Sequence, residues 1–243
     1  MKMNMNRTLG TGTFISIGSP VVTEIVSMMG FDWMLFDMEH GCVNEANLLH
    51  NLQAVRSPDV KIIVRVRTAE PTIISRVLDA GADGIMVPHV STPEQASAVV
   101  DSMLYPPRGS RGFSTSVRAM GFGKNPVKDT LAWEPPLFLA QIESREGVEA
   151  ASQIAAVEGV DMLFVGPRDL SLDLSVRKDP MDFDLAVRMV ASAATEAGKQ
   201  AGILVRNIAD RAKFEEYGYS ALAIGSDMGA LKKGYDEFKP KQV

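Results

Sequence analysis

The stretch Lys61–Val87, KIIVRVRTAEPTIISRVLDAGADGIMV, contains one complete unit of the predicted fold. It opens with the apolar run Lys61–Val64 and closes with a second run, Gly84–Val87, each typical of a strand buried on both faces. Between them, Pro71–Ala80 begins with proline and has apolar residues at helical spacing, and Gly81 follows as a stop. The stretch therefore predicts a strand, a helix and a second, parallel strand.

The same alternation continues along the whole chain. Further short apolar runs predict strands at Thr13–Ser16, Trp33–Phe36, Leu137–Ile142, Met162–Val165, Gly202–Val205 and Ala221–Ile224. Eight strands alternating with helices in 243 residues match the count and size of a (β/α)8 barrel, although an open doubly wound sheet would alternate in the same way. Because no repeat or linker divides the chain, we expect residues 1–243 to form a single domain.

The composition is that of an ordinary soluble globular protein, with 46% hydrophobic and 23% charged residues. A net charge of −5 gives no sign of a nucleic-acid partner. No apolar run reaches the roughly 18 residues that span a bilayer, and Met1–Thr8 lacks the apolar core of a signal peptide. We therefore expect a cytoplasmic protein with no membrane partner. The single cysteine, Cys42, excludes an internal disulfide.

Polar side chains follow the predicted strands at their carboxyl ends, where barrels keep their active sites. These residues are Asp37, Glu39, His40, Arg65, Arg67, His89, Gln141, Glu143, Arg168 and Asp169. Carboxylates with an imidazole and guanidinium groups form a site for a hard cation such as Mg²⁺ or Mn²⁺. Taken singly, each has a plainer explanation: Asp169 could cap a helix, and His40 could be structural. Their common position at strand ends of one polarity favours a shared site.

One segment, Tyr105–Pro136, breaks the alternation. It is rich in glycine, proline and arginine, and it has no clean period. Connections of this length inside a compact domain are usually functional loops or disordered. Since it lies between the fourth and fifth predicted strands, we expect it near the end of the barrel that holds the active site.

Four motifs, in the right order, resemble those of the HpcH/HpaI aldolase family. They are Gly30–Gly41, Tyr105–Gly112, Gln141–Glu146 and Gly166–Ser171, and the resemblance runs from about Gly10 to Gly234. Family members are class II, metal-dependent pyruvate aldolases, carbon–carbon lyases on a (β/α)8 TIM barrel of the phosphoenolpyruvate/pyruvate-binding type. The resemblance implies reversible cleavage of a 4-hydroxy-2-keto acid to pyruvate, or a related 2-keto acid, and an aldehyde through a metal-stabilised enolate.

The resemblance also implies the metal and substrate contacts. Glu143 and Asp169 correspond to the two protein ligands of a divalent metal, Mg²⁺, Mn²⁺ or Co²⁺, with Gln141 beside them. In the motif that opens with Gly166-Pro167, the backbone N–H groups of Arg168 and Asp169 correspond to those that bind the pyruvate carboxylate.

Further roles implied by the resemblance concern the base and the subunit contacts. Arg65 corresponds to the residue that holds the keto oxygen, and His40, in the motif Asp37-x-x-His40, corresponds to the base, acting directly or through a water. Asp79 matches an aspartate that orients this histidine in a neighbouring subunit. Family members are typically hexamers, built as trimers of dimers, in which C-terminal helices are exchanged; Asp227–Lys239 would be the exchanged helix here.

Two features depart from the family pattern. Arg168 stands where the usual motif has alanine, and Asp173–Asp184 is more charged than the glycine-rich stretch expected. If only the backbone N–H of Arg168 binds the substrate, the replacement of alanine leaves the expected site unchanged. If the side chain points inward, its positive charge favours a second acidic group on the substrate.

The sequence leaves the reaction partner of the enolate open. The same site residues would serve oxaloacetate decarboxylation or an enolate-trapping reaction like that of macrophomate synthase. A metabolite-binding barrel without turnover is a third interpretation, which the complete set of polar strand ends disfavours. The aldehyde, the stereochemistry and the pathway are not fixed by the sequence.

Overall fold

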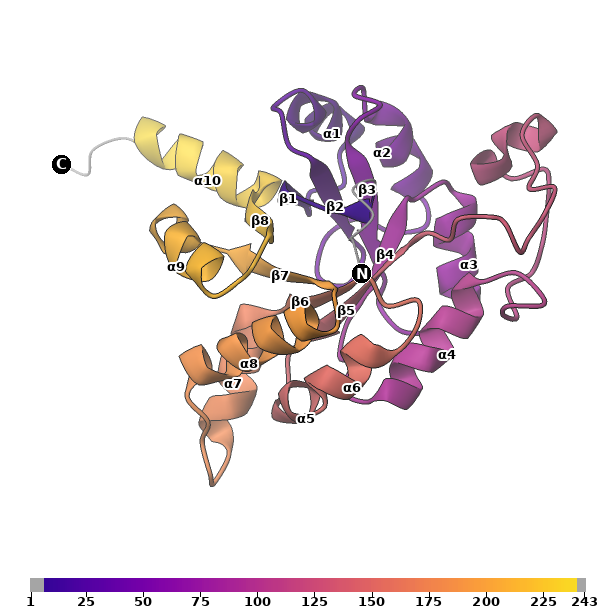
Figure 1. Cartoon of the computed structure of the whole chain (residues 1–243). Coiled ribbons are helices and arrows are strands. Elements are labelled where there is room, and N and C mark those ends of the chain that lie inside the picture. The colour runs from indigo at the N-terminus through magenta and orange to yellow at the C-terminus, as the bar shows by residue number, and fades with distance from the viewer. Residues whose placement is uncertain (1–6, 240–243) are drawn as a thin grey trace.

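Eight parallel strands close into one barrel in chain order in the computed structural model, which describes residues 7–239 (Figure 1). The strands are β1 (Thr11–Ile15), β2 (Trp33–Asp37), β3 (Lys61–Arg65), β4 (Gly84–Val87), β5 (Leu137–Ile142), β6 (Met162–Val165), β7 (Gln200–Val205) and β8 (Ala221–Ser226). β8 closes on β1, where Gly12 pairs with Ala223 on one side and with Trp33 on the other. This topology confirms the predicted barrel and excludes the open doubly wound sheet.

Helices surround the strands on the outside (Figure 1). The α-helices are α1 (Pro20–Ser27), α2 (Leu48–Ala54), α3 (Pro71–Asp79), α4 (Pro93–Met103), α5 (Arg145–Glu149), α6 (Ala151–Ala156), α7 (Pro167–Val176), α8 (Phe183–Glu196), α9 (Arg211–Glu216) and α10 (Asp227–Phe238). Short 3-10 helices lie at Arg118–Gly123 (η2) and Ile208–Asp210 (η3). Proline opens α1, α3, α4 and α7, a position where its missing N–H costs nothing.

The inside of the barrel is a packed apolar core. Phe14, Trp33, Leu35, Ile63, Met86, Leu139, Met162 and Phe164 form most of this cluster. The rings of Trp33 and Phe164 meet edge to face at 6.2 Å. A Cβ at Gly12 would lie 2.2 Å from the Trp33 ring, so only glycine leaves room for that indole. Since side chains fill the interior, any chemistry must take place at an end of the barrel.

The long connection between α4 and β5, residues 105–136, lies at the amino ends of the strands. Tyr105 and Trp133 of this segment line a cavity of about 1210 Å³ together with Lys61 and Leu137, which begin β3 and β5. The segment, which includes η2, extends outward past α3 (Figure 1, right). Our placement of this loop near the active-site end was wrong, because α4 first carries the chain back to the opposite end of the barrel.

The C-terminal helix α10 projects from the barrel (Figure 1, upper left). Its apolar residues Leu231, Tyr235 and Phe238 are 51%, 66% and 80% exposed. An apolar stripe left uncovered in this way usually marks an interaction surface. The stripe is compatible with exchange of the helix between subunits, which stays a prediction.

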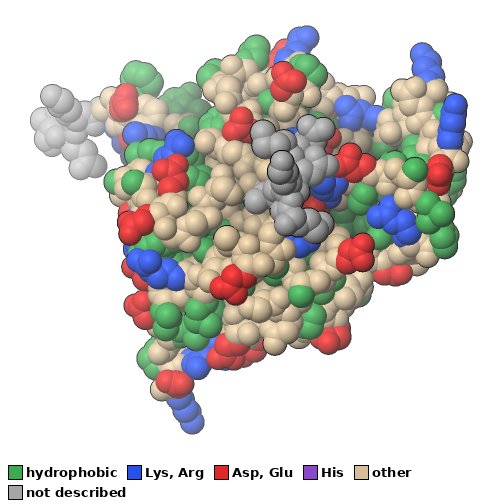
Figure 2. All heavy atoms as spheres, viewed as in Figure 1, with side chains coloured by type: hydrophobic (Ala, Val, Ile, Leu, Met, Phe, Trp, Pro, Cys, Tyr) green, Lys and Arg blue, Asp and Glu red, His purple; other side chains and the backbone are tan. Residues whose placement is uncertain are grey.

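Acidic and basic side chains are interspersed over the face of the molecule shown in Figure 2. Within residues 7–239, none of the helices is long and apolar enough to span a bilayer. Most of the predicted polar N-terminus, Met1–Thr8, lies outside the described residues.

Candidate active site

One cavity of about 720 Å³ lies at the carboxyl ends of the strands. It brings together eight of the residues singled out in the sequence: Asp37, His40, Arg65, Gln141, Gly166, Pro167, Arg168 and Asp169. Glu143 follows β5 directly and accepts a 2.7 Å hydrogen bond from Gln141 Nε2 on the cavity wall. Strands β2, β3, β5 and β6 thus deliver their polar ends to one place, as parallel strands of a barrel must.

Arg65 is a cation held in a fixed position. Its Nε and Nη2 donate to the two carboxylate oxygens of Asp37 at 2.9 and 2.7 Å, and Nη1 lies 3.0 Å from Glu39 Oε2. The guanidinium carbon lies 5.5 Å from the centre of the Phe14 ring. Burial alone would lower the pKa of Arg65, but the bonds and charge of Asp37 outweigh it and the pKa is raised. The guanidinium therefore stays charged and rigidly oriented.

Glu143 is a buried carboxylate in surroundings that contain further acidic groups. Burial raises its pKa, and the negative charges of Glu39 and Asp169 raise it further, while His89 acts in the opposite direction. The His89 backbone N–H donates to Glu143 Oε1 at 2.9 Å, and its Nδ1 lies 3.0 Å from the same oxygen. Within residues 7–239, Gln141 Oε1 is buried without a hydrogen-bond donor, and Glu39 Oε2 has the ion pair with Arg65 but no hydrogen bond of good geometry.

This donor set fits a divalent cation. One ligand atom each from Glu39, His89 and Glu143 lies within 4.8 Å of the others. Asp169 lies in the first turn of α7 on the same cavity. The charges of Glu39 and Asp169 repel that of the buried Glu143, and a bound cation would remove that repulsion.

Comparison with known proteins identifies the family. Residues 10–233 match the HpcH/HpaI aldolase/citrate lyase family. The chain belongs to this family. It is 38% identical to the 5-keto-4-deoxy-D-glucarate aldolase of Klebsiella pneumoniae subsp. pneumoniae, over 94% of this chain and 91% of that protein. The family and this relative assign the present chain as a carbon–carbon lyase. This assignment disfavours the interpretation of the chain as a binding protein without turnover.

Solved structures support the same family assignment. An HpcH/HpaI aldolase/citrate lyase family protein from Burkholderia cenocepacia superposes with a TM-score of 0.86 and 31% identity, covering 96% of this chain and 93% of that one. Macrophomate synthase superposes with a TM-score of 0.77 and 26% identity, covering 94% of this chain and 82% of that one. HpcH/HpaI aldolases depend on a divalent metal, and this chain has a donor set for one.

Gly166 allows the Glu143 side chain of this HpcH/HpaI family member to lie where it does. A Cβ at Gly166 would lie 2.5 Å from Glu143 Oε2 and 2.7 Å from Gln141 Nε2. We expect Gly166→Ala to displace both groups and to weaken Mn²⁺ binding about 10–100-fold, the usual effect of disturbing the groups around a metal ligand. Titration of the metal-free protein with Mn²⁺ measures this. Gly112→Ala, whose Cβ would meet open space, is the matched control; equal affinities would contradict the prediction.

His40 and Asp79, paired by the sequence prediction, lie apart within one chain. His40 lines the cavity, is 65% exposed at its side chain, and donates its backbone N–H to Asp37 at 3.2 Å. Asp79 ends α3 and accepts from Arg111 Nη2 at 2.7 Å, next to the loop at the amino ends of the strands. Contact between Asp79 and the His40 of a neighbouring subunit stays a prediction.

Several residues that lie at the site have no role assigned from the sequence. Glu39 and His89 were noted at strand ends but not assigned, although both contact the Glu143 region. Arg206 directly follows β7 and lines the cavity. The strand-end rule that selected Arg65 would also have found Arg206. Asp227 is buried and accepts from the backbone of Ser16 at 2.8 Å, so it holds the end of β1 in place.

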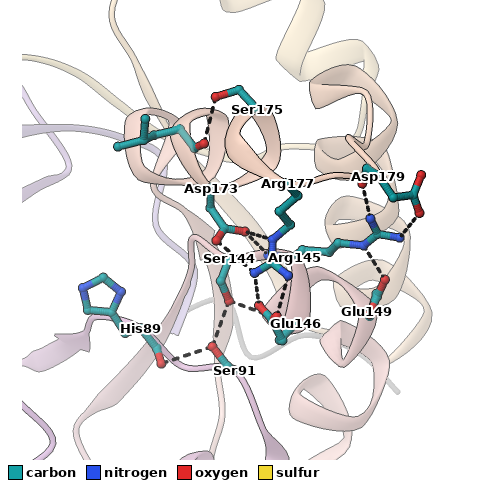
Figure 3. Close-up of polar contacts among 12 residues, drawn as sticks. His89, Ser91, Ser144, Arg145, Glu146, Glu149, Asp173, Ser175, Arg177 and Asp179 are labelled. Atoms are coloured by element: carbon teal, nitrogen blue, oxygen red, sulfur yellow. Dashed lines mark hydrogen bonds and ion pairs between the residues drawn. The ribbon is translucent and has the colours of Figure 1, made fainter.

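A polar network connects the segments that follow the two predicted ligands (Figure 3). Asp173, one turn after Asp169 on α7, accepts at 2.8 Å from the backbone of Arg145, which begins α5 two residues after Glu143. Arg177 donates to Asp173 at 2.9 and 3.0 Å, and to both carboxylate oxygens of Glu146 at 2.6 Å. The network therefore fixes α7 relative to α5.

The serine cap of α5 extends this network toward the metal site. Ser144 accepts from the backbone of Gly147 at 3.1 Å, and its hydroxyl lies 2.9 Å from that of Ser91. The Ser91 hydroxyl in turn donates to the His89 carbonyl at 3.4 Å (Figure 3). The segment after β4, which carries His89, is thereby linked to the start of α5, which follows Glu143.

Replacement of Arg177 by methionine should reduce the acid sensitivity of folding. Hydrogen bonds from Arg177 lower the pKa of both Glu146 and Asp173. A carboxylate with a lowered folded-state pKa stabilises the fold above its unfolded value, roughly pH 4, and this contribution is lost as the pH falls through the folded value. The wild type should therefore lose more stability than Arg177→Met between about pH 5 and pH 3. The difference should be modest because these side chains are partly exposed.

Thermal melts of both proteins at several pH values in that range measure the effect. Lys232→Met, which removes an exposed cation from α10, is the control. Parallel losses of stability in the wild type and Arg177→Met would show that the network does not lower these pKa values.

Proposed function

We propose that the chain is a single-domain class II aldolase that reversibly cleaves a 4-hydroxy-2-keto acid to pyruvate, or a related 2-keto acid, and an aldehyde. The observation that carries this proposal is the fixed Arg65 cation on the same cavity as Asp169, with the Glu143 carboxylate directly behind the cavity wall at Gln141. A retro-aldol reaction transfers an electron pair to a keto oxygen, and fixed positive charge at that oxygen lowers its barrier.

Glu143 and Asp169 would hold the metal, Mg²⁺, Mn²⁺ or Co²⁺. Glu39 and His89 form the alternative donors beside Glu143, but Glu39 Oε2 already lies 3.0 Å from Arg65. Mg²⁺ and Mn²⁺ prefer oxygen ligands, which favours Asp169 over the His89 imidazole. When bound, the metal would act as a Lewis acid toward the keto oxygen.

The protein groups around the substrate have separate tasks. Arg65 would stabilise the negative charge that develops on the C2 oxygen. The free N–H groups in the first turn of α7, at Arg168 and Asp169, would bind the C1 carboxylate, helped by the helix dipole. His40 would take the proton of the C4 hydroxyl as the C3–C4 bond breaks; the bond's electron pair moves to the C2–C3 enolate, and C4 becomes the aldehyde carbon.

The assembly proposed is a homo-hexamer, a trimer of dimers that exchange α10. It is supported by the uncovered apolar stripe on α10 and by the position of Asp79, which could orient His40 only from a neighbouring chain. Light scattering on the purified protein would test it, since a monomer would remove the role given to Asp79.

An alternative on the same site is oxaloacetate decarboxylation or an enolate-trapping reaction, which the likeness to macrophomate synthase favours. Both would use the same enolate. Incubation of the Mg²⁺-loaded enzyme with pyruvate and a panel of aldehydes, and separately with oxaloacetate, distinguishes them by NMR of the products. We expect 4-hydroxy-2-keto acids from the first mixture. Decarboxylation without any aldol product would overturn the aldolase assignment in favour of the alternative.

A further inference from the structure

A second large cavity lies at the end of the barrel opposite to the candidate active site. Its volume of about 1210 Å³ exceeds the 720 Å³ of the active-site cavity. We call it the amino-end cavity, because the loop 105–136 and the residues just before β2, β3 and β4 form its walls. The two cavities share no lining residue, so a ligand in the amino-end cavity would not touch the active-site residues.

Two buried side chains on the loop wall of this cavity have polar atoms without a partner. Arg111 and Tyr105 line the cavity and are 3% and 1% exposed. Within residues 7–239, neither the Arg111 Nε nor the Tyr105 hydroxyl has a hydrogen-bond partner. Buried polar atoms of this kind are rare because losing their water is costly, and most of all on a charged group. An acceptor on a bound molecule would satisfy both atoms.

The two groups lie close together and are held in place. Arg111 Nη2 donates to Asp79 Oδ1 at 2.7 Å. The guanidinium carbon lies 4.7 Å from the centre of the Tyr105 ring and 6.0 Å from that of Trp133. Burial raises the pKa of Tyr105, so its hydroxyl keeps its proton and can donate. Both donors are therefore oriented before any ligand binds, which reduces the entropy lost on binding.

The loop wall also carries a second cation. Arg118 lines the cavity and donates to the Ala80 carbonyl at 2.8 Å, and no carboxylate of the described chain is paired with it. The acidic residues of the cavity lie elsewhere or are paired: Asp32, Asp59 and Asp83 precede strands, and Glu134 lies 3.5 Å from Arg7. An anionic group is therefore attracted to the part of the wall that holds Arg111 and Arg118.

We propose that the amino-end cavity binds a small organic acid, whose carboxylate accepts hydrogen bonds from Arg111 Nε and the Tyr105 hydroxyl. Guanidinium groups are well suited to carboxylates, and a hydrogen bond between two charged groups is stronger than one between neutral groups. Trp133, Met120 and Leu137 line the same cavity and would contact the apolar part of the acid. Apolar walls with a few fixed polar groups are typical of small-molecule sites.

The test is the binding of benzoate to the full chain, followed by tryptophan fluorescence. The chain has two tryptophans: Trp33 is fully buried in the barrel core, and Trp133 lines the amino-end cavity. A ligand in this cavity should therefore change the emission of Trp133. Benzamide is the uncharged analogue of benzoate, and inorganic phosphate is an anion without an apolar part.

Three variants complete the experiment. Tyr105→Phe removes the hydroxyl and leaves the buried pair of Arg111 and Asp79 intact. Trp133→Phe removes the fluorescent reporter, so its benzoate binding is measured by calorimetry. Lys124→Gln is the matched control, because Lys124 is an exposed cation of the same loop that does not line the cavity.

Benzoate should change the fluorescence of the wild type saturably, and benzamide and phosphate should bind at least about tenfold more weakly. Tyr105→Phe should weaken benzoate binding about tenfold, as expected for loss of one hydrogen bond to a charged group. Lys124→Gln should keep the affinity of the wild type. Trp133→Phe should lose the fluorescence change while calorimetry still detects binding.

The absence of a saturable change in the wild type, or equal affinities of the wild type and Tyr105→Phe, would overturn the proposed site. Benzamide or phosphate binding as tightly as benzoate would overturn its assignment to an organic acid. Since no step of the experiment measures aldolase activity, its outcome is independent of the proposed function.

Discussion

Replacement of Arg65 by alanine should lower kcat for aldol cleavage about 10²–10³-fold. Removal of one preorganised donor to a developing oxyanion has effects of this size. The structure makes Arg65 well suited to that task, because Asp37 holds its guanidinium through two hydrogen bonds and Phe14 lies beneath it. Arg65→Lys should recover little activity, since an ammonium group cannot form the paired contact with Asp37.

The Arg65 experiment needs a control for folding, because the substitution leaves the buried Asp37 carboxylate without its cation. We expect a destabilisation of about 3–5 kcal/mol, the usual cost of breaking a buried pair. The control is Arg67→Gln, two residues after Arg65, which removes an exposed arginine paired with Glu45. This variant should keep both the activity and the melting temperature of the wild type. Activity of folded Arg65→Ala within a few-fold of the wild type would contradict its role at the keto oxygen.

Replacement of His40 by alanine should lower kcat for aldol cleavage about 10²–10⁴-fold, the usual contribution of a general base. The side chain is 65% exposed, and its ion pair with Glu39 is long, at 3.9 Å. Its loss should therefore leave the melting temperature and the Mn²⁺ affinity unchanged. His50→Ala, on the exposed face of α2, is the matched control.

Comparison of two reactions sharpens the His40 test. Decarboxylation of oxaloacetate breaks a bond to CO₂ and requires no proton removal from a hydroxyl group. The rate of decarboxylation should therefore fall much less in His40→Ala than the rate of aldol cleavage. Equal losses in the two reactions would show that His40 acts by binding or positioning and not as the base.

The strands of the barrel were predictable because parallel strands covered on both faces are continuous apolar runs. The predicted runs Lys61–Val64 and Gly84–Val87 coincide with β3 and β4 to within one residue. The location of the polar residues that follow these runs was predictable too. Because all strands are parallel, their carboxyl ends lie at the same end of the barrel, and so do the residues that follow them. Arg65, Gln141 and Asp169 accordingly line one cavity.

Other features depend on contacts that no local pattern encodes. His89, which lies 3.0 Å from Glu143, has a left-handed backbone with φ of 56°, which is uncommon for a residue other than glycine. The loop 105–136 has no period, and its position follows from α4, which returns the chain to the amino ends of the strands. The predicted contact of Asp79 with His40 would require a neighbouring subunit, about which a single sequence carries no direct information.

The most direct test of the central claim is the aldolase activity of the full chain after treatment with EDTA. The claim is that the reaction depends on a cation held by Glu143 and Asp169. We predict that the chelator lowers the rate by more than about 100-fold, because the Lewis acid at the keto oxygen is lost. Addition of Mg²⁺, Mn²⁺ or Co²⁺ in excess should restore the rate. Full activity in the chelator would contradict the metal-dependent mechanism.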